Sequence, residues 1–157
     1  CCIIGLLHGQ EEFIVWISTR GRYALRVMVD LAENNNSEYI PLKDIAKRQE
    51  ISEKYLETII RLLVKANILS GLRGKGGGYK LTKSPDQYTV GAILRLTEDS
   101  LAPVSCLGPG AAVCARAAEC RTLHMWQGLD KVINEYLDNV TIADLMKSGA
   151  AGDNYVI

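Results

Sequence analysis

The segment from Leu42 to Leu81 constrains the fold of this chain more than any other part of the sequence. It begins with LKDIAKRQEIS, a helical pattern followed by Ser52, a residue suited to cap a second helix. The next residues, EKYLETIIRLLVK, place apolar and polar side chains on separate faces of that second helix. Two short helices joined by a tight turn, with a basic polar face on the second, are typical of a helix-turn-helix that binds DNA. The apolar face comprises Leu56, Ile59, Ile60 and Leu63, and the polar face comprises Lys54, Glu57, Thr58, Arg61 and Lys65.

The segment that follows, ILSGLRGKGGGYKLT, has two short strand-like runs on either side of a glycine-rich turn. Glycine permits positive φ and close backbone approach, which suits a hairpin tip that lies along a phosphate backbone. Arg73, Lys75 and Lys80 lie on or beside the turn, so the pattern predicts the wing of a winged helix. The alternative is a surface hairpin that only caps the domain. A nucleotide-binding loop is disfavoured, because no Ser or Thr follows a Gly-Lys pair.

The distribution of charge favours DNA binding over simple packing of the helices. From Pro41 to Lys83 there are ten Lys and Arg against four Asp and Glu, a net charge of +6 in a chain whose total is zero. A basic segment in an otherwise acidic chain is the footprint expected of a phosphate-binding surface. A basic surface that is only solvated is the alternative.

Composition and length indicate a globular protein, either one domain of ordinary size or a small domain with an appended interaction helix. The chain has 157 residues, of which 48% are hydrophobic and 23% charged. No run is long and apolar enough to span a membrane, and the opening CCIIGLLHG lacks the basic region and cleavage site of a signal peptide. These features predict a cytoplasmic protein that does not contact a membrane.

The first fourteen residues differ from the rest, because they have neither a clear period nor a turn signal. The stretch Gln10-Glu11-Glu12 fits the translation of a purine-rich ribosome-binding sequence, so our hypothesis is a native start at Val15, with a cloning remnant as the alternative. The pattern then changes to STRGRYALRVMVDLAEN, which predicts an amphipathic first helix. The arginines at its start either bond phosphates at the groove edge or are solvated. The arginines off its apolar stripe are Arg20, Arg22 and Arg26.

Beyond the hairpin, the sequence predicts a helix over VGAILRLTED, a linker that contains Pro and Gly, and a long last helix. The last helix is predicted to begin at about Ala118. Its apolar stripe is wide for the end of a small domain, so we expect it to bury against the same helix of a second subunit. The run TIADLMKSG predicts a short final helix.

Three cysteines, Cys106, Cys114 and Cys120, lie in the loop CLGPGAAVCARAAEC, and His124 follows them. Thiolates are soft ligands suited to iron–sulfur clusters or zinc, and a loop rich in Gly, Pro and Ala lets three of them converge. The spacing is not that of a zinc ribbon, while a zinc site of three Cys and one His stays open, as do three unrelated thiols. A nucleophile pair of Cys120 and His124 has no oxyanion motif or orienting third group beside it, so we do not expect an enzyme.

From about Val15 to Lys147 the chain resembles the Rrf2 family of bacterial winged-helix transcription regulators, which includes IscR, NsrR and CymR. The GRYA form of the first helix looks like the IscR branch. The resemblance implies a homodimeric transcription factor, mainly α with a small β-wing, whose long C-terminal helix forms the dimer and which binds a palindromic operator in double-stranded DNA. The matching pieces are STRGRYALRVMVDLA, IPLKDIAKRQEISEKYLETIIRLLVKANIL, GLRGKGGGYKLTKSPDQYTVGAIL, CRTLHMW and LDNVTIADLM.

The resemblance also implies roles for particular residues in metal binding. In the IscR branch three cysteines hold a [2Fe–2S] cluster whose presence changes the DNA sites recognised, and Cys106, Cys114 and Cys120 match them in order. The branch uses a histidine three residues after the last cysteine as fourth ligand, but here that position is Leu123 and the histidine is His124, about 100° further round a helix. The fourth ligand is then His124 if the helix starts late, and otherwise a water, an exogenous thiol or a residue elsewhere. NsrR-like proteins carry an acidic ligand where this chain has an arginine, and CymR-like regulators lack the cysteine triad.

For DNA, the family match places Glu57 on the side of the recognition helix that faces the groove, where a carboxylate can accept a bond from cytosine. It places Arg73 at a position on the wing that reaches the minor groove. The complete predicted DNA-binding set is Arg20, Arg22, Lys54, Glu57, Thr58, Arg61, Arg73 and Lys75.

The leading hypothesis is a repressor or activator that senses through an iron–sulfur cluster. The alternative is a cluster-free regulator of the cysteine-metabolism type, controlled by thiol chemistry, zinc or a partner protein. A zinc-stabilised interaction module without a DNA role is disfavoured by the basic segment. The predicted organisation is a non-native or disordered leader at 1–14, a winged helix-turn-helix domain at 15–100, a cysteine-containing sensor loop at 101–122, a dimerisation helix and short terminal helix within 118–147, and a tail at 148–157.

Overall fold

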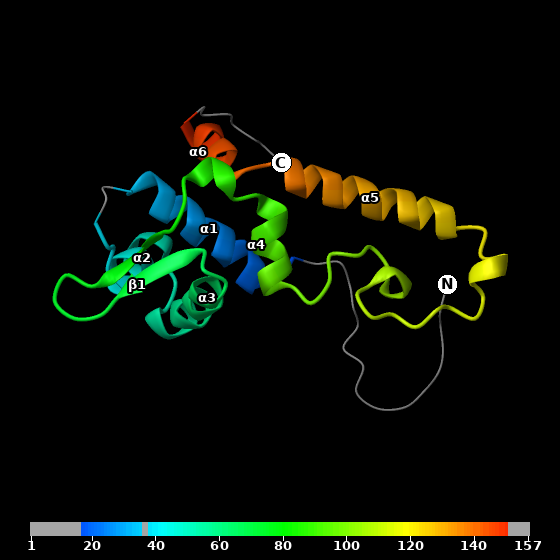
Figure 1. The fold of residues 1–157 in the computed structure, drawn as a ribbon, viewed down its shortest axis with the longest axis horizontal. Helices are drawn as coiled ribbons and strands as arrows, with labels where there is room; N and C mark the ends of the chain where they lie inside the picture. The colour runs from blue at the N-terminus through cyan, green and yellow to red at the C-terminus, as the bar shows by residue number, and fades with distance from the viewer. Residues whose placement is uncertain (1–16, 36–37, 151–157) are drawn as a thin grey trace.

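The computed structural model of the protein describes residues 17–35 and 38–150. It is mainly helical with one two-stranded antiparallel sheet, as the sequence predicts (Figure 1). The predicted leader, the start at Val15 and the last residues of the tail lie outside the described residues. The elements are α1 (Thr19–Glu33), α2 (Leu42–Gln49), α3 (Glu53–Lys65), β1 (Leu69–Leu72), β2 (Gly78–Leu81), α4 (Val90–Thr97), α5 (Leu123–Asn139) and α6 (Ile142–Ala150), with short 3-10 turns at Pro85–Gln87, Ser105–Leu107 and Ala117–Glu119.

Side-chain caps fix where several helices begin. Ser18, Ser52 and Thr89 each precede a helix and accept a hydrogen bond from the backbone N–H three residues further on. α2 ends at Gln49, and the left-handed backbone of the next residue, Glu50, with φ of 55°, turns the chain sharply toward α3. The cap predicted at Ser52 is confirmed, and α2 and α3 form the helix-turn-helix.

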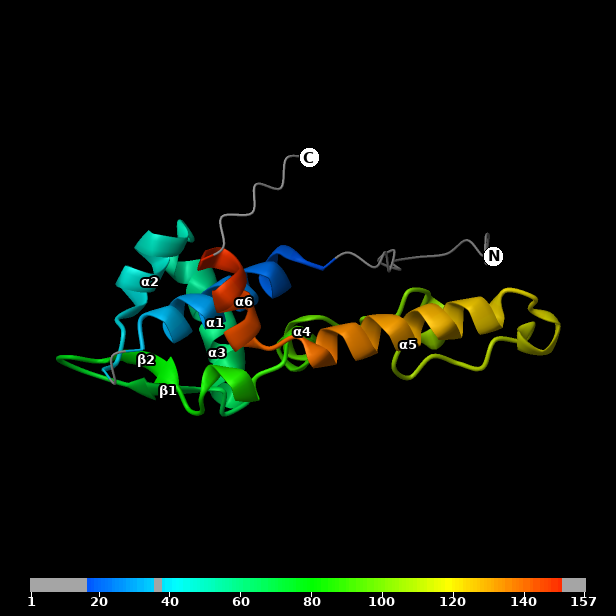
Figure 2. The ribbon, with the colours of Figure 1, turned by 90° about the horizontal axis from the view of Figure 1, so that it is seen from above.

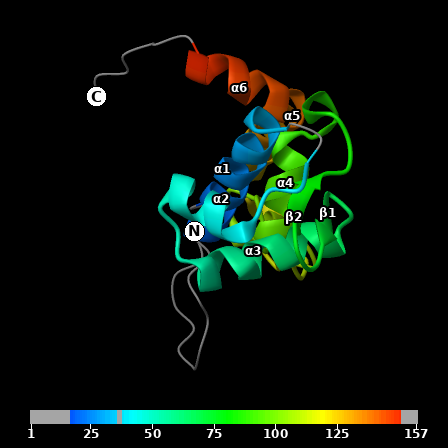
Figure 3. The ribbon, with the colours of Figure 1, turned by 90° about the vertical axis from the view of Figure 1, so that its left-hand side faces the viewer.

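One hydrophobic core holds α1, α2, α3 and the base of the hairpin together. α1 crosses the middle of the domain, with α3 on one side and α6 on the other (Figure 3). Ile142 at the start of α6 is fully buried in this core, so α6 packs against the same domain as α1, α2 and α3. Burial of a side chain of this size contributes about 1.5–3 kcal/mol. The predicted apolar face of α3 is confirmed, since its four members are at most 1% exposed: Leu56, Ile59, Ile60 and Leu63.

The hairpin is also held through β2 to the segment that precedes α2. β1 and β2 pair antiparallel, and Tyr79 of β2 exchanges two backbone hydrogen bonds with Ile40, at 2.8 and 3.0 Å. A side chain at Gly78 would collide with the Ile40 carbonyl, so this approach requires glycine. The hairpin is therefore held by the core at its base and by Ile40 close to its turn, and the turn itself extends beyond the helices (Figure 1).

α5 differs from the other helices, because it has no buried residue and projects from the domain with residues 101–122 beside it (Figure 1 and Figure 2). The prediction that this helix begins near Ala118 is wrong, since it begins at Leu123. Residues Ala117–Glu119 form a separate 3-10 turn, and the extended backbone of Cys120 interrupts helical geometry between the two. In the described part of the chain, no helix combines the length and apolar character needed to cross a membrane.

Candidate nucleic-acid interface and cysteine cavity

The outer face of α3 carries the polar side chains predicted for a recognition helix. Lys54, Thr58 and Arg61 are exposed, and Glu57 is partly exposed. The Arg61 guanidinium donates to the Glu57 carboxylate at 2.7 Å, one helical turn away. The Thr58 hydroxyl donates to the Tyr55 carbonyl at 2.6 Å, which leaves its oxygen available as an acceptor. This face offers both donors and acceptors to base edges.

A cleft of about 710 Å³ lies between α3 and the hairpin, and basic side chains line it. Arg61 and Lys65 line the cleft from α3 and Arg73 lines it from the hairpin, beside the carboxylate of Glu57. Three cations around one open groove create a positive potential that attracts phosphate. Lys65 was absent from the predicted DNA-binding set, although its helical spacing places it on the same face.

The tip of the hairpin is an exposed turn that contains Arg73 and Lys75. Gly74 and Gly76 have φ of 95° and 77°, values that residues with side chains rarely adopt. The Gly77 N–H donates to the Gly74 carbonyl at 2.9 Å and closes the turn. The turn therefore presents two positive charges beyond the sheet, where they can reach a nucleic-acid backbone.

The two predicted arginines at the start of α1 have different surroundings. Arg20 donates from Nε to the Thr97 carbonyl at 2.8 Å, which ties α1 to the end of α4. Arg22 is exposed and donates to the Thr19 hydroxyl at 3.1 Å. A groove between the start of α1 and α3 is lined by Arg20 and Thr58. The fold thus brings Arg20 beside the recognition helix, whereas Arg22 lies outside that groove.

A buried carboxylate that the sequence analysis missed fixes α2 against α1. Asp30 is 3% exposed and accepts two hydrogen bonds from the Arg48 guanidinium, at 2.8 and 2.7 Å, and one from the Gln49 amide at 3.0 Å. The hydrogen bond to Asp30 raises the pKa of Arg48 above its ordinary value. A single acidic residue within the apolar run VMVDLA was the available signal, because a carboxylate on a buried helix face requires a partner.

The three predicted cysteine ligands are free thiols that line one cavity of about 510 Å³, beside the start of α5. Thiolates are the donors that iron–sulfur clusters use, so the chemical type of the donor set fits such a cluster. Within residues 17–35 and 38–150, however, no three His, Cys, Asp or Glu side chains are grouped closely enough to hold one metal ion. The fold gathers the thiols around one space without assembling a ligand geometry.

His124 follows the cavity without lining it. α5 starts late, at Leu123, but Leu123 rather than His124 lines the cavity, and His124 is exposed. Charged residues that the sequence analysis did not single out also line the cavity: Arg116, Glu119 and Arg121.

Cys120 has a hydrogen bond that sets its acidity. Its sulfur lies 3.5 Å from the Thr122 hydroxyl oxygen. Hydrogen bonds from the Thr122 hydroxyl and backbone lower the pKa of Cys120 below its ordinary value, because they stabilise the thiolate. The thiolate is the form that binds metals and reacts with oxidants, so the lowered pKa favours both metal ligation and oxidation at Cys120.

The chain is similar in sequence to known proteins. The family model that matches residues 17–148 is Rrf2, described as an iron-dependent transcriptional regulator. The chain is 34% identical over 131 residues to the HTH-type transcriptional regulator IscR of Vibrio campbellii, a match that covers 83% of this chain and 77% of that protein.

Two solved structures have a similar fold. T. potens IscR is 36% identical, with a TM-score of 0.66, and the match covers 85% of this chain and 88% of that one. CymR (YrzC), the global cysteine regulator of B. subtilis, is 34% identical, with a TM-score of 0.69, and the match covers 85% and 97%. Backbone similarity to these two regulators is therefore nearly the same.

Proposed function

The chain belongs to the Rrf2 family of DNA-binding transcriptional regulators, and we propose that within it the chain is an IscR-like regulator that senses through an iron–sulfur cluster. The family consists of regulators of transcription rather than enzymes. The proposal rests on one observation, that the chain combines a basic cleft between α3 and the hairpin with a cavity lined by three thiols. The cleft supplies DNA recognition, and the cavity supplies a site whose occupancy can change.

In the proposed complex, α3 enters the major groove and the hairpin lies along the backbone. Lys54, Glu57 and Thr58 face base edges, with the Glu57 carboxylate accepting a hydrogen bond from a cytosine amine. Arg73 and Lys75 extend from the wing to the adjacent backbone and minor groove. The exposed positions of these side chains and the cluster of cations in the cleft support this arrangement. The remaining predicted residues that supply positive charge near phosphates are Arg20, Arg22 and Arg61.

The active form in this proposal is a cytoplasmic homodimer joined through α5. Large apolar side chains at i, i+4, i+7 and i+11 of that helix are 40–69% exposed, which forms a stripe suited to association. A two-fold dimer would present two copies of α3 to a palindromic operator. The side chains of the stripe are Met125, Leu129, Val132 and Tyr136.

Cys106, Cys114 and Cys120 would hold the cluster through their sulfurs, and the lowered pKa of Cys120 favours ligation near neutral pH. When bound, the cluster supplies iron–thiolate bonds that cross-link the loop. The loop leads directly into α5, so a change in its conformation can shift the arrangement of the dimer. The fourth ligand in this proposal is His124 or, in its place, a water, an exogenous thiol or a residue elsewhere.

A second candidate function is a cluster-free regulator whose thiols respond to oxidation, zinc or a partner protein. The similarity to CymR favours it. So does Cys120, which is partly exposed and has a lowered pKa, both properties of a redox-reactive cysteine.

The test combines two measurements on the full chain purified without oxygen. The first is a visible absorption spectrum with iron and acid-labile sulfide assays, and the second is selection of bound duplexes from a random DNA pool. We expect charge-transfer bands, matched iron and sulfide, and enrichment of a palindrome. The Cys114→Ser variant should lose the spectrum and keep the ability to select DNA.

The two measurements separate the candidates. A colourless, iron-free protein that cannot be reconstituted but still enriches a palindrome would favour the cluster-free regulator. A protein that enriches no sequence would contradict both candidates.

A further inference from the structure

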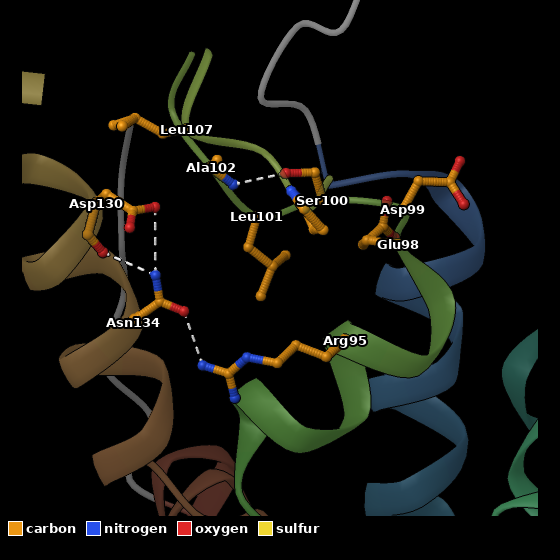
Figure 4. Close-up of a pocket in the computed structure, with 10 residues that line it drawn as sticks. Arg95, Glu98, Asp99, Ser100, Leu101, Ala102, Leu107, Asp130 and Asn134 are labelled. Carbon is orange, nitrogen blue, oxygen red and sulfur yellow. Dashed lines mark hydrogen bonds between the residues drawn. The ribbon is translucent and has the colours of Figure 1, made fainter. Parts of the chain in front are cut away.

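α4 is joined to α5 by a fork of hydrogen bonds from one arginine. The Arg95 guanidinium donates to both carboxylate oxygens of Asp138, at 2.6 and 2.9 Å, and to the Asn134 amide oxygen at 2.8 Å. The Asn134 amide in turn donates to the Asp130 carbonyl at 2.8 Å, so the acceptor is itself held in place (Figure 4). The hydrogen bonds raise the pKa of Arg95 and lower that of Asp138, which keeps both groups charged.

Gly91 makes room for this fork. A side chain at Gly91 would collide with the Asp138 carboxylate and would lie 2.9 Å from the Arg95 guanidinium. Glycine inside a helix is conformationally unfavourable, so the close approach of α5 gives a physical reason for its presence.

The other end of α4 is joined to α1 in a similar way. Glu98 accepts hydrogen bonds from the Ser18 hydroxyl at 2.7 Å and from the Ser18 backbone N–H at 3.3 Å. A side chain at Gly21 would collide with the Glu98 carboxylate. The start of α1 borders the recognition helix, because Ser18 and Thr58 line the same groove. α4 therefore links α5 to the edge of the predicted DNA surface.

The cysteine-containing loop, residues 101–122, also lies beside the fork between α4 and α5. A cavity of about 360 Å³ beside the fork is lined by Arg95, Asn134 and Leu107 (Figure 4). Leu107 belongs to the turn Ser105–Leu107, which also contains Cys106, and Cys106 lines the thiol cavity. One turn thus borders both cavities, so a conformational change at Cys106 alters the wall beside the fork.

We propose that Arg95 is a positioning residue that fixes the angle between α5 and the DNA-binding domain, and thereby sets the distance between the two recognition helices of the dimer. The inference rests on the proposed function, since it requires subunits joined through α5 that bind two half-sites. The side chains of Arg95 and Asp138 are 42% and 47% exposed, so the ion pair adds little to folding stability. Its two parallel hydrogen bonds fix the orientation of α5 relative to α4. A fixed orientation is needed to hold the two recognition helices at the distance that separates the half-sites.

The test is DNA binding by the full chain to duplexes with two half-sites, taken from the sequence that the wild-type protein selects. The half-sites are separated by the selected spacing or by about one or two base pairs more or fewer. For Arg95→Met, affinity at the selected spacing should fall about tenfold and the preference among spacings should flatten. Affinity for a single half-site should stay within about twofold, because the DNA-facing residues are unchanged.

Two further variants make the test specific. Gly91→Ala displaces the Asp138 carboxylate without removing a charge, and it should flatten the preference in the same way. Lys147→Met removes an exposed ion pair within α6 that joins no two elements, so this matched control should keep the wild-type preference. Circular dichroism and sedimentation establish that each variant is folded and dimeric.

The link to the cysteine loop is tested by treating the protein with iodoacetamide, which places carbamidomethyl groups on the loop thiols. The preferred spacing of the wild type should shift, and that of Arg95→Met should not shift further. An equal shift in both proteins would overturn the link. Unchanged spacing preference in both Arg95→Met and Gly91→Ala would overturn the proposal, as would loss of binding to a single half-site. Failure of the proposed function is distinct, because the wild-type protein would then select no sequence at all.

Discussion

The DNA-binding domain and the arm formed by residues 101–139 differ in what holds their shape. In the domain, side chains such as Leu56 and Ile59 are fully buried in a common core. In the arm, α5 has no buried residue, and the three cysteines are partly or fully exposed. A close-packed core keeps its geometry without help, whereas an open segment takes its geometry from whatever binds it. The domain is therefore suited to DNA recognition by a fixed surface, and the arm is suited to a change in conformation when a ligand binds.

The largest effect we expect is a loss of domain stability on truncation of the core. Leu56→Ala removes a fully buried side chain and leaves a cavity, so the free energy of unfolding should fall by about 2–5 kcal/mol. Val132→Ala in the arm removes a side chain that is 61% exposed in the single chain, so the loss should stay below about 0.5 kcal/mol at concentrations where the chain is monomeric. Urea unfolding followed by circular dichroism measures both values.

Protein concentration separates packing from association in this experiment. If α5 forms the dimer, Val132→Ala should lower the unfolding midpoint more at concentrations where the chain is dimeric than at concentrations where it is monomeric. Equal losses in Leu56→Ala and Val132→Ala at every concentration would break the comparison, because the arm would then be packed as firmly as the domain.

A smaller effect is expected on DNA affinity, and only in the domain. Arg73→Ala removes a cation from the wing, so affinity for all duplexes should fall about tenfold and the slope of log affinity against log salt should decrease by about one. The matched change in the arm, Cys114→Ser, should leave the affinity of the metal-free protein within about twofold at the same salt concentration. Fluorescence anisotropy titrations at several salt concentrations test both, and equal losses would contradict the division of roles.

Glu57→Ala should change sequence preference more than affinity. The carboxylate is paired with Arg61, so its removal frees a cation that attracts phosphate while it removes an acceptor for a base. We expect discrimination at one operator position to fall about fivefold, which is about 1 kcal/mol, while affinity for the selected site changes little. Titration over a panel of single-base variants measures this. Glu57→Gln serves as control, since it keeps an oxygen acceptor, and a panel unchanged in Glu57→Ala would refute the role of Glu57.

The difference between the packed domain and the exposed arm also explains how far the sequence alone could predict the structure. In the domain, local signals and tertiary packing agree: the apolar period of α3, the cap at Ser52 and the glycines of the hairpin all correspond to observed elements. In the arm, the local sequence signals and the observed structure disagree. The run CARAAEC is rich in Ala and favours helix, yet the chain is extended at Cys120 and the helix begins at Leu123.

Contacts between distant segments were beyond prediction for a different reason. The pairs Asp30–Arg48 and Arg95–Asp138 depend on the angles at which helices pack, and those angles leave no period in a single sequence. The residues that line the thiol cavity could not be predicted for a similar reason. Successive residues of a helix are rotated by about 100°, so the exact start of α5 decides whether Leu123 or His124 faces the cavity.

The smallest effect we expect is chemical and confined to the arm. Thr122→Val removes the hydroxyl that lowers the pKa of Cys120, so that pKa should rise and the thiolate fraction near neutral pH should fall. Alkylation of Cys120 by iodoacetamide, followed by peptide mass spectrometry, should slow about two- to threefold near neutral pH. The two rates should converge at alkaline pH, where both proteins are fully thiolate. Cys106 is the internal control, and its rate should not change. A Cys120 rate that is independent of Thr122 would mean that exposure alone, rather than a local hydrogen bond, sets the reactivity of the arm.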